Sequence, residues 1–395
     1  MKEMKEMKEM KEYIIQTLIF SPYLFLMAGI NFIPNGDKKM VIFCLISIIT
    51  SVIYYNAKYL KENIKNPVLW ICALLAIYLS ISYSIKDGSP SLLRAFLSAV
   101  LVMFFIPPLS NKNLLFLATL GAGCLFFNSV YQSFYLDHSR SAGLVNVIPY
   151  ATFCSTLFLI GIYFIIKNHD KKQTSLAIII IILSTTSIIL SLSRGVWLAL
   201  VVATFAMIIC QFLRSKKLWK YISIIFISGI SILYLFKEPI LDRAQETISE
   251  IHEIQKGNLN TSIGLRLQMW KASYFIAQEN LFFGVGGQHQ SILNKLYDTG
   301  KVSNDLLKFQ PQHYHNQLID FMVKYGLIGV FFIILLYLSP IVTSIYYKSD
   351  YTILIVGISS LYFIAGLTDV PLNHSQTIYI YILFMVPLSS MRKTS

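Results

Sequence analysis

Two histidines separated by one residue, His313 and His315, are the first candidates for acid–base chemistry in this sequence. They belong to a His-Tyr-His-Asn stretch that ends at Asn316, shortly before a long apolar run. A neutral imidazole, with an ordinary pKa of about 6.5, can take a proton from a hydroxyl group at neutral pH. Loops also contain many histidines that are simply solvated, and the two residues alone do not exclude that alternative.

Three arginines, Arg140, Arg194 and Arg266, could bind a phosphate or pyrophosphate group. The guanidinium group is always charged, and its forked donors match the oxygens of a phosphate. Each arginine also has an ordinary interpretation. Arg194 stands at the end of an apolar run, where arginines extend to the membrane surface. Arg266 could be a surface charge on an amphipathic helix, and Arg140 a solvated loop charge.

Asp369 and His374 stand between the last two apolar runs. Asp369 could orient a histidine, bind a sugar hydroxyl or pair with a neighbouring base, since charged residues near membrane depth tend to be functional. His374 has a weaker claim. Trp270 lies four residues after Arg266 and shares its helix face. Trp270 and Tyr314 could stack on sugar rings, although a tryptophan here also suits the membrane interface.

The elements that must position these residues are membrane helices. Hydrophobic residues make up 55% of the 395 residues and charged residues only 13%, with a mean hydropathy of +0.60. Soluble domains carry about 25% charged residues, so lipid must be the solvent of this chain. The net charge of +13 would suggest nucleic acid for a soluble protein, but here it indicates basic cytoplasmic loops, and we expect no nucleic-acid partner.

Apolar runs of sufficient length predict an all-α polytopic protein with about twelve transmembrane helices. They cover roughly residues 13–33, 39–56, 67–85, 92–109, 113–135, 146–166, 174–193, 195–213, 218–236, 326–346, 351–367 and 375–391. Ser193 to Gly195 interrupt a continuous apolar run and predict a tight hairpin. No small-residue cleavage site follows the first run, so we expect no cleaved signal peptide.

The distribution of lysine and arginine along the chain predicts its orientation in the membrane. With the N-terminus in the cytoplasm, far more basic residues fall on the inner segments than on the short outer loops. This predicts a cytoplasmic tail at 1–12 with a Met-Lys-Glu repeat, nine helices within 13–236, an outer loop at 237–325, three helices within 326–391 and a cytoplasmic tail at 392–395. All the candidate site residues then lie on the outer side.

The outer loop should be partly helical. Apolar residues at helical spacing predict an amphipathic helix from Pro239 to Gln255, lying across the bundle or on the membrane. A second helix should begin after a cap at Asn260–Ser262 and end near Gln278. The Gly-Val-Gly-Gly stretch at 284–287 predicts a backbone turn rather than a nucleotide-binding loop.

Neither a metal site nor a disulfide is expected from the residues. The five cysteines all fall inside apolar runs and lack the spacing of metal ligands. We find no carboxylate cluster on the outer side that would suit a divalent cation. We therefore expect no cofactor and no metal.

Five short motifs in this order and on this side of the membrane resemble the bacterial lipopolysaccharide O-antigen ligases, within the superfamily that includes O-antigen polymerases. The motifs are Ser-Arg-Gly at 193–195, Gly-x-Arg at 264–266, Gly-Val-Gly-Gly at 284–287, His-x-His-Asn at 313–316 and Gly-Leu-Thr-Asp at 366–369. The topology match covers nearly the whole chain, whereas the motifs cover only short windows.

The resemblance implies a GT-C-like membrane glycosyltransferase of the bacterial inner membrane. It would transfer a polysaccharide from undecaprenyl pyrophosphate to a sugar of the lipid A–core at the periplasmic face, without metal or ATP. Because His315 directly precedes Asn316, as in the family motif, it is the first choice for the general base, with His313 second. Arg194, Arg266 and Arg140 would bind the pyrophosphate. Direct attack would invert the anomeric centre.

Two other functions remain open at this point. An O-antigen polymerase would use the same donor with a lipid-linked acceptor, and the histidine spacing favours a ligase over it. A transporter of lipid-linked oligosaccharide should show charged or broken helices at mid-membrane, often in repeated halves. The spans hold few charges and show no obvious repeat.

Overall fold

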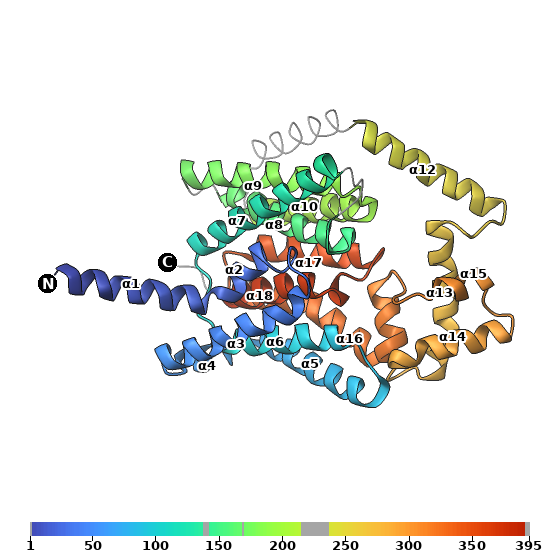
Figure 1. Cartoon of the computed structure of the whole chain (residues 1–395), viewed down its shortest axis with the longest axis horizontal. Helices are drawn as coiled ribbons and strands as arrows, with labels where there is room; N and C mark the ends of the chain where they lie inside the picture. Colours follow the sequence, from blue (N-terminus) through green and yellow to red (C-terminus); the bar gives the residue numbers. More distant parts are fainter. Residues whose placement is uncertain (1, 137–141, 168–169, 215–236, 392–395) are drawn as a thin grey trace.

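The computed structural model describes residues 2–136, 142–167, 170–214 and 237–391. Within these ranges the regular structure is helical, apart from one isolated bridge between Ala142 and Val145. Figure 1 shows a bundle of roughly parallel helices with a smaller helical group at one end. The predicted all-α class is confirmed for the described residues.

The bundle consists of helices from both halves of the chain. Their bounds are α1 (Lys2–Ile19), α2 (Ser21–Ala28), α3 (Gly36–Tyr55), α4 (Lys58–Asn63), α5 (Pro67–Lys86), α6 (Pro90–Phe105), α7 (Asn111–Val130) with the π-helical turn η1 (Tyr131–Tyr135), α8 (Val147–Lys167), α9 (Lys171–Leu190), α10 (Arg194–Arg214), α16 (Gln317–Tyr346), α17 (Thr352–Gly366), the 3-10 turn η3 (Pro371–Asn373) and α18 (Ser375–Ser390).

The smaller group comes from the long predicted loop. Its elements are α12 (Lys237–Gln255), α13 (Ser262–Glu279), the 3-10 turn η2 (Gly286–Gln288), α14 (His289–Asp298) and α15 (Asn304–Phe309). Thr261 caps α13 by accepting a hydrogen bond from the backbone N–H of Gly264, as the predicted cap requires. Both helices predicted in this loop are present. The Met-Lys-Glu repeat is part of the exposed helix α1.

Several bundle helices begin at recognisable sequence signals. Asn66 caps α5 and Ser89 caps α6, each followed by a proline at the first helical position. Ser110 caps α7 in the same way through the backbone N–H of Asn113. A capping side chain satisfies an N–H that has no partner within the helix, and proline lacks that donor altogether. These signals fix where the chain enters the bundle.

The bundle surface is that of a membrane protein. Among the described residues, seven helices are long and apolar enough to cross a membrane, and α6, α17 and α18 are shorter apolar helices. Helix α10 exposes Leu198, Val201, Phe205 and Ile209, which share one face at helical spacing. A continuous apolar face of this kind suits lipid. The count of twelve spans stays a prediction, and residues 218–236, the predicted ninth span, lie outside the described residues.

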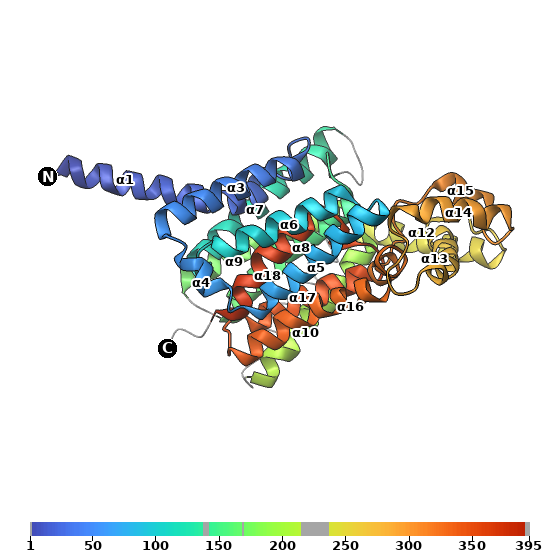
Figure 2. The ribbon, with the colours of Figure 1, turned by 90° about the horizontal axis from the view of Figure 1, so that it is seen from below.

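Helices α8 and α18 form the centre of the bundle and are buried along nearly their whole length. Polar groups hold α18 in place. The hydroxyl of Tyr23 donates to the carbonyl of Leu383 over 2.8 Å, and the side-chain amide of Asn66 donates to the carbonyl of Val386 over 2.7 Å. In Figure 2, α18 lies between the N-terminal helices and the pair α10 and α17. Segments far apart in sequence therefore share one core.

Helix α16 is broken at Gly326, where φ is 65° and ψ is −165°. The loop before η2 docks against the break and satisfies its backbone groups. The N–H of Leu327 donates to the carbonyl of Leu281 over 2.9 Å, and the N–H of Val285 donates to the carbonyl of Val323 over 2.8 Å. A broken helix is tolerated where neighbouring backbone supplies these partners. The break lets the first turns of α16 join helices α12–α15.

The start of α1 and the end of α18 lie at the opposite end of the bundle from helices α12–α15, which are called the outer helices after the predicted outer loop. Figures 1 and 2 agree on this placement. The residues before α16 and between α17 and α18 lie at the end of the outer helices, and the candidate site is there.

Candidate active site

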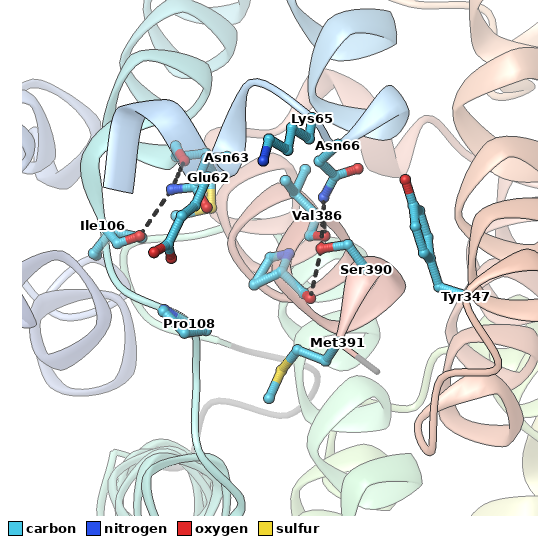
Figure 3. Close-up of a pocket in the computed structure, with 12 residues that line it drawn as sticks. Glu62, Asn63, Lys65, Asn66, Ile106, Pro108, Tyr347, Val386, Ser390 and Met391 are labelled. Atoms are coloured by element: carbon cyan, nitrogen blue, oxygen red, sulfur yellow. Dashed lines mark hydrogen bonds between the residues drawn. The ribbon is translucent and has the colours of Figure 1, made fainter. Parts of the chain in front are cut away.

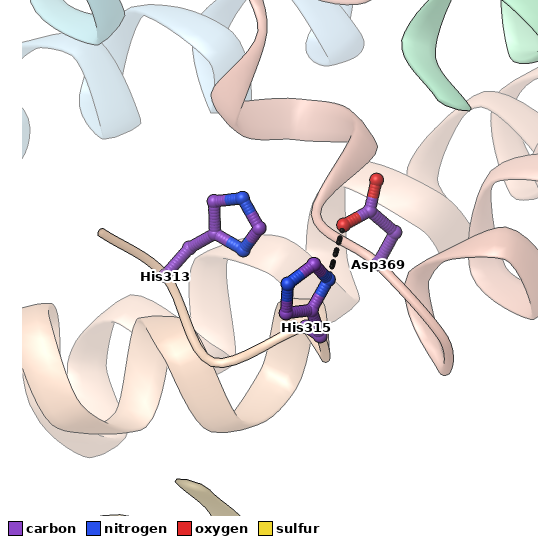
Figure 4. Close-up of side chains that lie close together, drawn as sticks. All are labelled: His313, His315 and Asp369. Carbon is purple, nitrogen blue, oxygen red and sulfur yellow. Dashed lines mark hydrogen bonds and ion pairs between the residues drawn. The ribbon is translucent and has the colours of Figure 1, made fainter. Parts of the chain in front are cut away.

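His315 and Asp369 form a hydrogen-bonded pair at the outer end of the bundle. Nδ1 of His315 lies 3.0 Å from Oδ1 of Asp369, and the side chains are 20% and 2% exposed (Figure 4). A carboxylate accepts the Nδ1–H of the neutral imidazole, which leaves Nε2 as the atom that can accept a proton. The pair thus has the geometry of a histidine base oriented by an acid, as in hydrolytic triads.

The backbone of His315 has a φ of 48°, in the left-handed region that few side chains adopt. Such a conformation costs on the order of 1 kcal/mol and persists when its surroundings hold it. Two contacts hold the preceding residue, Tyr314. Nε1 of Trp270 donates to its carbonyl over 2.9 Å, and its N–H donates to Oδ1 of Asp320 over 3.2 Å. The turn is therefore fixed from α13 on one side and α16 on the other.

Asn316 positions the same turn against the loop that carries Asp369. Its Oδ1 accepts from the N–H groups of Leu318 and Ile319 over 3.0 and 3.1 Å, which caps α16. Its Nδ2 donates to the carbonyl of Leu367 over 3.2 Å. The His-x-His-Asn and Gly-Leu-Thr-Asp motifs therefore meet through two side chains. Asn316 acts as a helix cap that brings His315 to Asp369.

The buried carboxylate of Asp320 is the centre of a polar network that the sequence did not predict. Asp320 is fully buried and pairs with Nζ of Lys324 at 2.9 Å. It also accepts from Nδ2 of Asn373 over 2.5 Å, and Asn373 in turn accepts from Nε2 of Gln317 over 3.0 Å. The signal in the sequence was an Asp and a Lys four residues apart at the start of an apolar helix.

His313 and His374 lie beside the pair. The ring centroids of His313 and His315 are 4.3 Å apart, and those of His313 and His374 are 6.1 Å apart. Burial lowers the pKa of His313 to about 4 against an opposing effect of Asp369, and burial likewise lowers the pKa of His374. Both imidazoles are therefore neutral at pH 7.

Three atoms of this cluster are buried and have no hydrogen-bond partner within the described part of the chain: Nδ1 of His313, Nε2 of His374 and Oδ2 of Asp369. A buried polar atom without a partner costs about 1–3 kcal/mol, so folded proteins keep few of them. A cluster of three such atoms beside a histidine pair suits a polar substrate that supplies the missing hydrogen bonds.

Asp369 remains ionised in this setting. Burial by itself raises the pKa of the carboxyl group, but the hydrogen bond from His315 and the nearby His374 and His313 outweigh burial, and the pKa of Asp369 is held below its usual value. An ionised carboxylate can stabilise the imidazolium that forms when His315 takes a proton.

Arg194 begins α10 and faces α12. Its guanidinium lies 3.0 Å from Oε1 of Glu250 and contacts the hydroxyl of Thr247. The neighbouring Gly195 packs against Thr368, and a Cβ at that glycine would lie 2.4 Å from the Thr368 hydroxyl oxygen. Only glycine allows this approach. The Ser-Arg-Gly motif is therefore adjacent to the loop of Asp369. The predicted tight turn is present, but it occupies residues 191–193, and Arg194 and Gly195 already belong to α10.

Arg266 lies half-buried on α13 and has no hydrogen-bond or ion-pair partner among the described residues. Burial lowers the pKa of its guanidinium, opposed by Asp369 and assisted by Arg194. Arg266 is thus within electrostatic range of both residues and remains charged at neutral pH. An unpaired, half-buried cation beside the histidine pair suits an anionic group of a substrate.

Two further predicted residues have different outcomes. Arg140 lies outside the described residues. Trp270 supports the histidine turn through its hydrogen bond to Tyr314, a contact that neither sugar stacking nor interfacial anchoring required. Glu250 joins α10, α12 and α13, because its Oε1 binds Arg194 and its Oε2 accepts from the N–H of Ile263 over 2.9 Å.

His313, His315 and Asp369 could also hold a metal ion, since one ligand atom of each lies within 4.8 Å of the others. Two imidazoles and a carboxylate are a ligand set that zinc and similar metals accept. This ligand set is not readable from the sequence, because the carboxylate is 54 residues from His315.

Two of the cavities formed by the described residues lie at opposite ends of the bundle. One, of about 410 Å³, borders His313 and His374. The other, of about 400 Å³, lies where α4, α6 and α18 end (Figure 3). In the latter, the amide of Asn63 donates to the carbonyls of Met103 and Ile106 over 2.9 and 3.0 Å. That amide caps the last turn of α6 by binding carbonyl groups that have no partner within the helix. In this second cavity, the polar side chain of Asn63 therefore stabilises the end of a helix.

The family model described as O-antigen ligase matches residues 179–334. That range includes Arg194, Arg266 and the histidine turn. The resemblance to the O-antigen ligase family is confirmed. The match lies on the part of the chain that builds most of the site, and the family is one of membrane glycosyltransferase type. Together with the apolar helices of the described residues, this resemblance indicates a multi-pass bacterial membrane protein.

Two relatives extend the likeness beyond the matched range. An uncharacterised protein of Haemophilus influenzae is 27% identical over 345 residues, which cover 82% of each chain. An O-antigen ligase of Escherichia coli is 24% identical over 220 residues, which cover 54% of this chain and 51% of that protein. The likeness to the Haemophilus influenzae protein therefore extends beyond the residues of the family match.

Proposed function

We propose that this chain is an O-antigen ligase that transfers polysaccharide from undecaprenyl pyrophosphate to a sugar hydroxyl of lipid A–core. The observation that carries the proposal is the His315–Asp369 pair, whose histidine lies within the residues that match this family, with Arg266 beside it. A base, an orienting carboxylate and an unpaired cation are the groups that this reaction needs. ATP is not required, because the pyrophosphate-linked donor is already activated.

The acceptor hydroxyl is a poor nucleophile until it loses its proton. Nε2 of His315 takes that proton as the hydroxyl oxygen attacks the anomeric carbon of the donor. The new C–O bond forms as the bond from the anomeric carbon to the pyrophosphate oxygen breaks, through an oxocarbenium-like transition state. Attack opposite the leaving group inverts the anomeric centre. Asp369 stabilises the imidazolium and is not itself protonated.

The leaving pyrophosphate keeps the electron pair of the broken bond. Arg266 and Arg194 stabilise its charge by forked hydrogen bonds. Glu250 holds Arg194 in place and partly neutralises it until substrate arrives, since the pair is within 3.0 Å. Arg140 would add to this group from its outer loop. The two arginines thus take the place of a divalent cation, and we propose that the reaction is metal-independent.

His315 is a better base than His313. The pKa of His313 is lowered to about 4 by burial, so at neutral pH it binds a proton weakly. A general base works best when its pKa is near the working pH. An adjacent carboxylate orients the imidazole and accepts its Nδ1–H, which leaves Nε2 to take the proton. His315 has that carboxylate, and His313 borders the neighbouring cavity instead.

We further propose a GT-C-like inner-membrane protein of about twelve spans, with both termini cytoplasmic and the 237–325 segment periplasmic. The basic inner loops support this orientation. The start of α1 and the end of α18 lie at the opposite end of the bundle from α12–α15, which agrees with this orientation. Both substrates carry acyl or polyprenyl chains, so they approach the site through the outer leaflet of the bilayer.

The test is complementation in a bacterium that lacks its own O-antigen ligase. We expect the chain to restore a ladder of O-antigen-bearing lipopolysaccharide on a gel, and His315→Ala to abolish it while the protein remains inserted. His252→Ala, an exposed histidine on α12, is the matched control and should keep the ladder.

The alternative functions give different outcomes. Restored chain length in a polymerase-deficient strain, with no ladder in the ligase-deficient strain for any core, would make the protein a polymerase. A wild-type ladder from His315→Ala would remove His315 as the base. Accumulation of lipid-linked oligosaccharide on the cytoplasmic side of a deletion strain would indicate a transporter.

A further inference from the structure

The cavity of about 410 Å³ beside the histidines is built from five separate segments. We call it the amide cavity. Its walls are the loop after α5 (87–92), the stretch 286–290, residues 312–313, residues 324–325 of α16 and residues 373–374. Its volume is within the range of small-molecule binding sites, about 300–1,000 Å³. Because His313 lies both in its wall and beside His315, the amide cavity opens next to the proposed base.

The lining of the amide cavity suits neutral hydroxyl groups rather than phosphate. Side-chain amides line it at Gln290, Gln312 and Asn373. The amide of Asn373 is bound to Asp320 and Gln317, and Nε2 of Gln290 donates to the carbonyl of Pro311 over 2.7 Å, which leaves the oxygen of Gln290 and the amide of Gln312 for a ligand. The lysine in its wall, Lys324, is already bound to Asp320 at 2.9 Å and to the carbonyl of Gln312 at 2.7 Å. Amides donate and accept at once, as vicinal sugar hydroxyls require. The charge of the lysine is compensated within the protein.

Two of the residues with a buried atom that has no partner among the described residues line the amide cavity. They are His313, through its Nδ1, and His374, through its Nε2. Neutral imidazole nitrogens exchange hydrogen bonds with hydroxyl groups as donor or acceptor. Hydroxyls of a bound sugar would satisfy both atoms and bring one hydroxyl to His315.

Neither Arg194 nor Arg266 lines the amide cavity. Arg194 is tied to Glu250, and Arg266 interacts with Asp369 and Arg194. The histidine pair therefore borders two chemically different regions. One carries the two arginines, and the other carries amides, the carboxylate of Asp87 and a lysine that is paired with Asp320. The leaving pyrophosphate belongs to the cationic region, and the donor sugar is attached to it.

We propose that the amide cavity binds the acceptor saccharide, the core sugar whose hydroxyl is deprotonated by His315. This inference rests on the proposed function and deepens it by giving the acceptor a binding site with named residues. Gln312 and Gln290 are specificity-determining residues there.

One wall of the amide cavity explains the glycines at 284–287. Gly286, with φ of 59°, and Gly287 lie against the backbone of Lys86 and Asp87. A Cβ would lie 2.4 Å from the carbonyl oxygen of Lys86 in the first case and 2.2 Å from that of Asp87 in the second. The side chain of Lys86 also donates to the carbonyl of Gly284 over 2.6 Å. The predicted backbone turn at 284–287 therefore packs against the end of α5 and forms one wall of the amide cavity.

The kinetic test measures the two substrates separately in purified protein. We expect Gln312→Ala to raise the KM for the acceptor about tenfold, the effect of about one lost hydrogen bond, and to leave the KM for the donor within about twofold. Gln290→Ala should act in the same direction. Gln278→Ala, an exposed glutamine on α13 outside the amide cavity, is the matched control and should leave both constants unchanged.

A binding measurement separates this inference from the proposed function. Core oligosaccharide released from lipopolysaccharide by mild acid is added to wild-type protein and to Gln312→Ala, and saturation-transfer NMR reports binding. Loss of binding in Gln312→Ala supports the amide cavity even if no transfer is found. Equal binding in both proteins overturns the inference while His315→Ala still tests the reaction. A rise in donor KM with unchanged acceptor KM would assign the cavity to the donor and also overturn it.

Discussion

The carboxylate of Asp320 accepts a hydrogen bond over 3.2 Å from the backbone N–H of Tyr314, the residue between the two site histidines. The same carboxylate binds Lys324 at 2.9 Å and Asn373 at 2.5 Å. One buried side chain thus joins α16, the histidine turn and the segment before α18. Asp320 touches no reacting atom in the proposed mechanism and is a positioning residue.

Replacement of Asp320 by leucine should strongly destabilise the protein. Lys324, whose side chain is 14% exposed, would keep its charge without its partner. Loss of one partner of a buried pair costs about 3–5 kcal/mol. Thermal unfolding of purified protein in detergent measures this, with Lys271→Ala on the exposed face of α13 as a control that should not shift the midpoint.

The double variant Asp320→Leu with Lys324→Met separates stability from positioning. It removes both charges, so most of the lost stability should return. Transfer should remain at least about tenfold reduced, because the N–H of Tyr314 and the amide of Asn373 still lack their acceptor. Full recovery of both stability and transfer would show that Asp320 has no role in placing the histidines.

Arg266→Lys tests the arginine that has no protein partner among the described residues. Lysine keeps the charge but cannot make the forked contact with two phosphate oxygens. We expect kcat/KM for the donor to fall about 10–100-fold, which corresponds to about 1.4–2.7 kcal/mol. Unchanged kinetics with the donor would remove Arg266 from the pyrophosphate site.

The sequence predicted those features that local patterns determine. The cap at Thr261 and the turn before Arg194 are where their short motifs place them. Three roles were open for Asp369, and pairing with a histidine was one of them. The motif places an acid near the outer end of a span, but it does not indicate which base that acid contacts. The contact spans 54 residues of sequence, and only the packing of α16 against α17 brings it about.

Other site features gave no readable signal. Glu250 lies on an acidic helix face together with other carboxylates, so the sequence does not distinguish it from a solvated residue. Its role is visible only from its ion pair with Arg194 in the structure. Trp270 has an apolar ring and a polar N–H. Only the tertiary structure shows that this N–H donates to the carbonyl of Tyr314. The break at Gly326 was the expected start of a span, since a glycine in an apolar run does not reveal a positive φ.

Gly326→Ala should disrupt the docking of the outer loop on α16. Its φ is 65°, and a Cβ there would lie 2.2 Å from the carbonyl oxygen of Phe282. Strain of this kind costs at least about 1–3 kcal/mol. We expect a lower unfolding midpoint and loss of transfer together. Gly123→Ala in α7 has open space around it and should be neutral or stabilising. Equal midpoints for the two variants would contradict the argument.

His289 predicts how stability changes on acidification. It is buried against Tyr314, whose hydroxyl lies 3.2 Å from its Nδ1, and burial with the nearby Lys324 lowers its pKa to about 4. The unfolded chain binds a proton at about pH 6.5, so stability falls as pH drops from about 6.5 to 4, by at most about 3 kcal/mol. The unfolding midpoint should therefore fall between pH 7 and pH 5. His289→Phe should show a smaller fall, and parallel curves would show that another group is responsible.

Removal of metal ions distinguishes the two chemical uses of His313, His315 and Asp369. If the arginines stabilise the pyrophosphate and His315 is the base, transfer after dialysis against EDTA should stay within about twofold of the untreated rate. The ligand atoms of the three residues lie within 4.8 Å of one another, so a bound cation is the competing arrangement. A bound cation would occupy the nitrogen lone pairs of the two histidines. Transfer would then be lost after EDTA treatment and would return when the right metal ion is added. Elemental analysis of the purified protein before and after dialysis completes the test, because a stoichiometric metal that leaves together with activity would replace the base mechanism with a metal-assisted one.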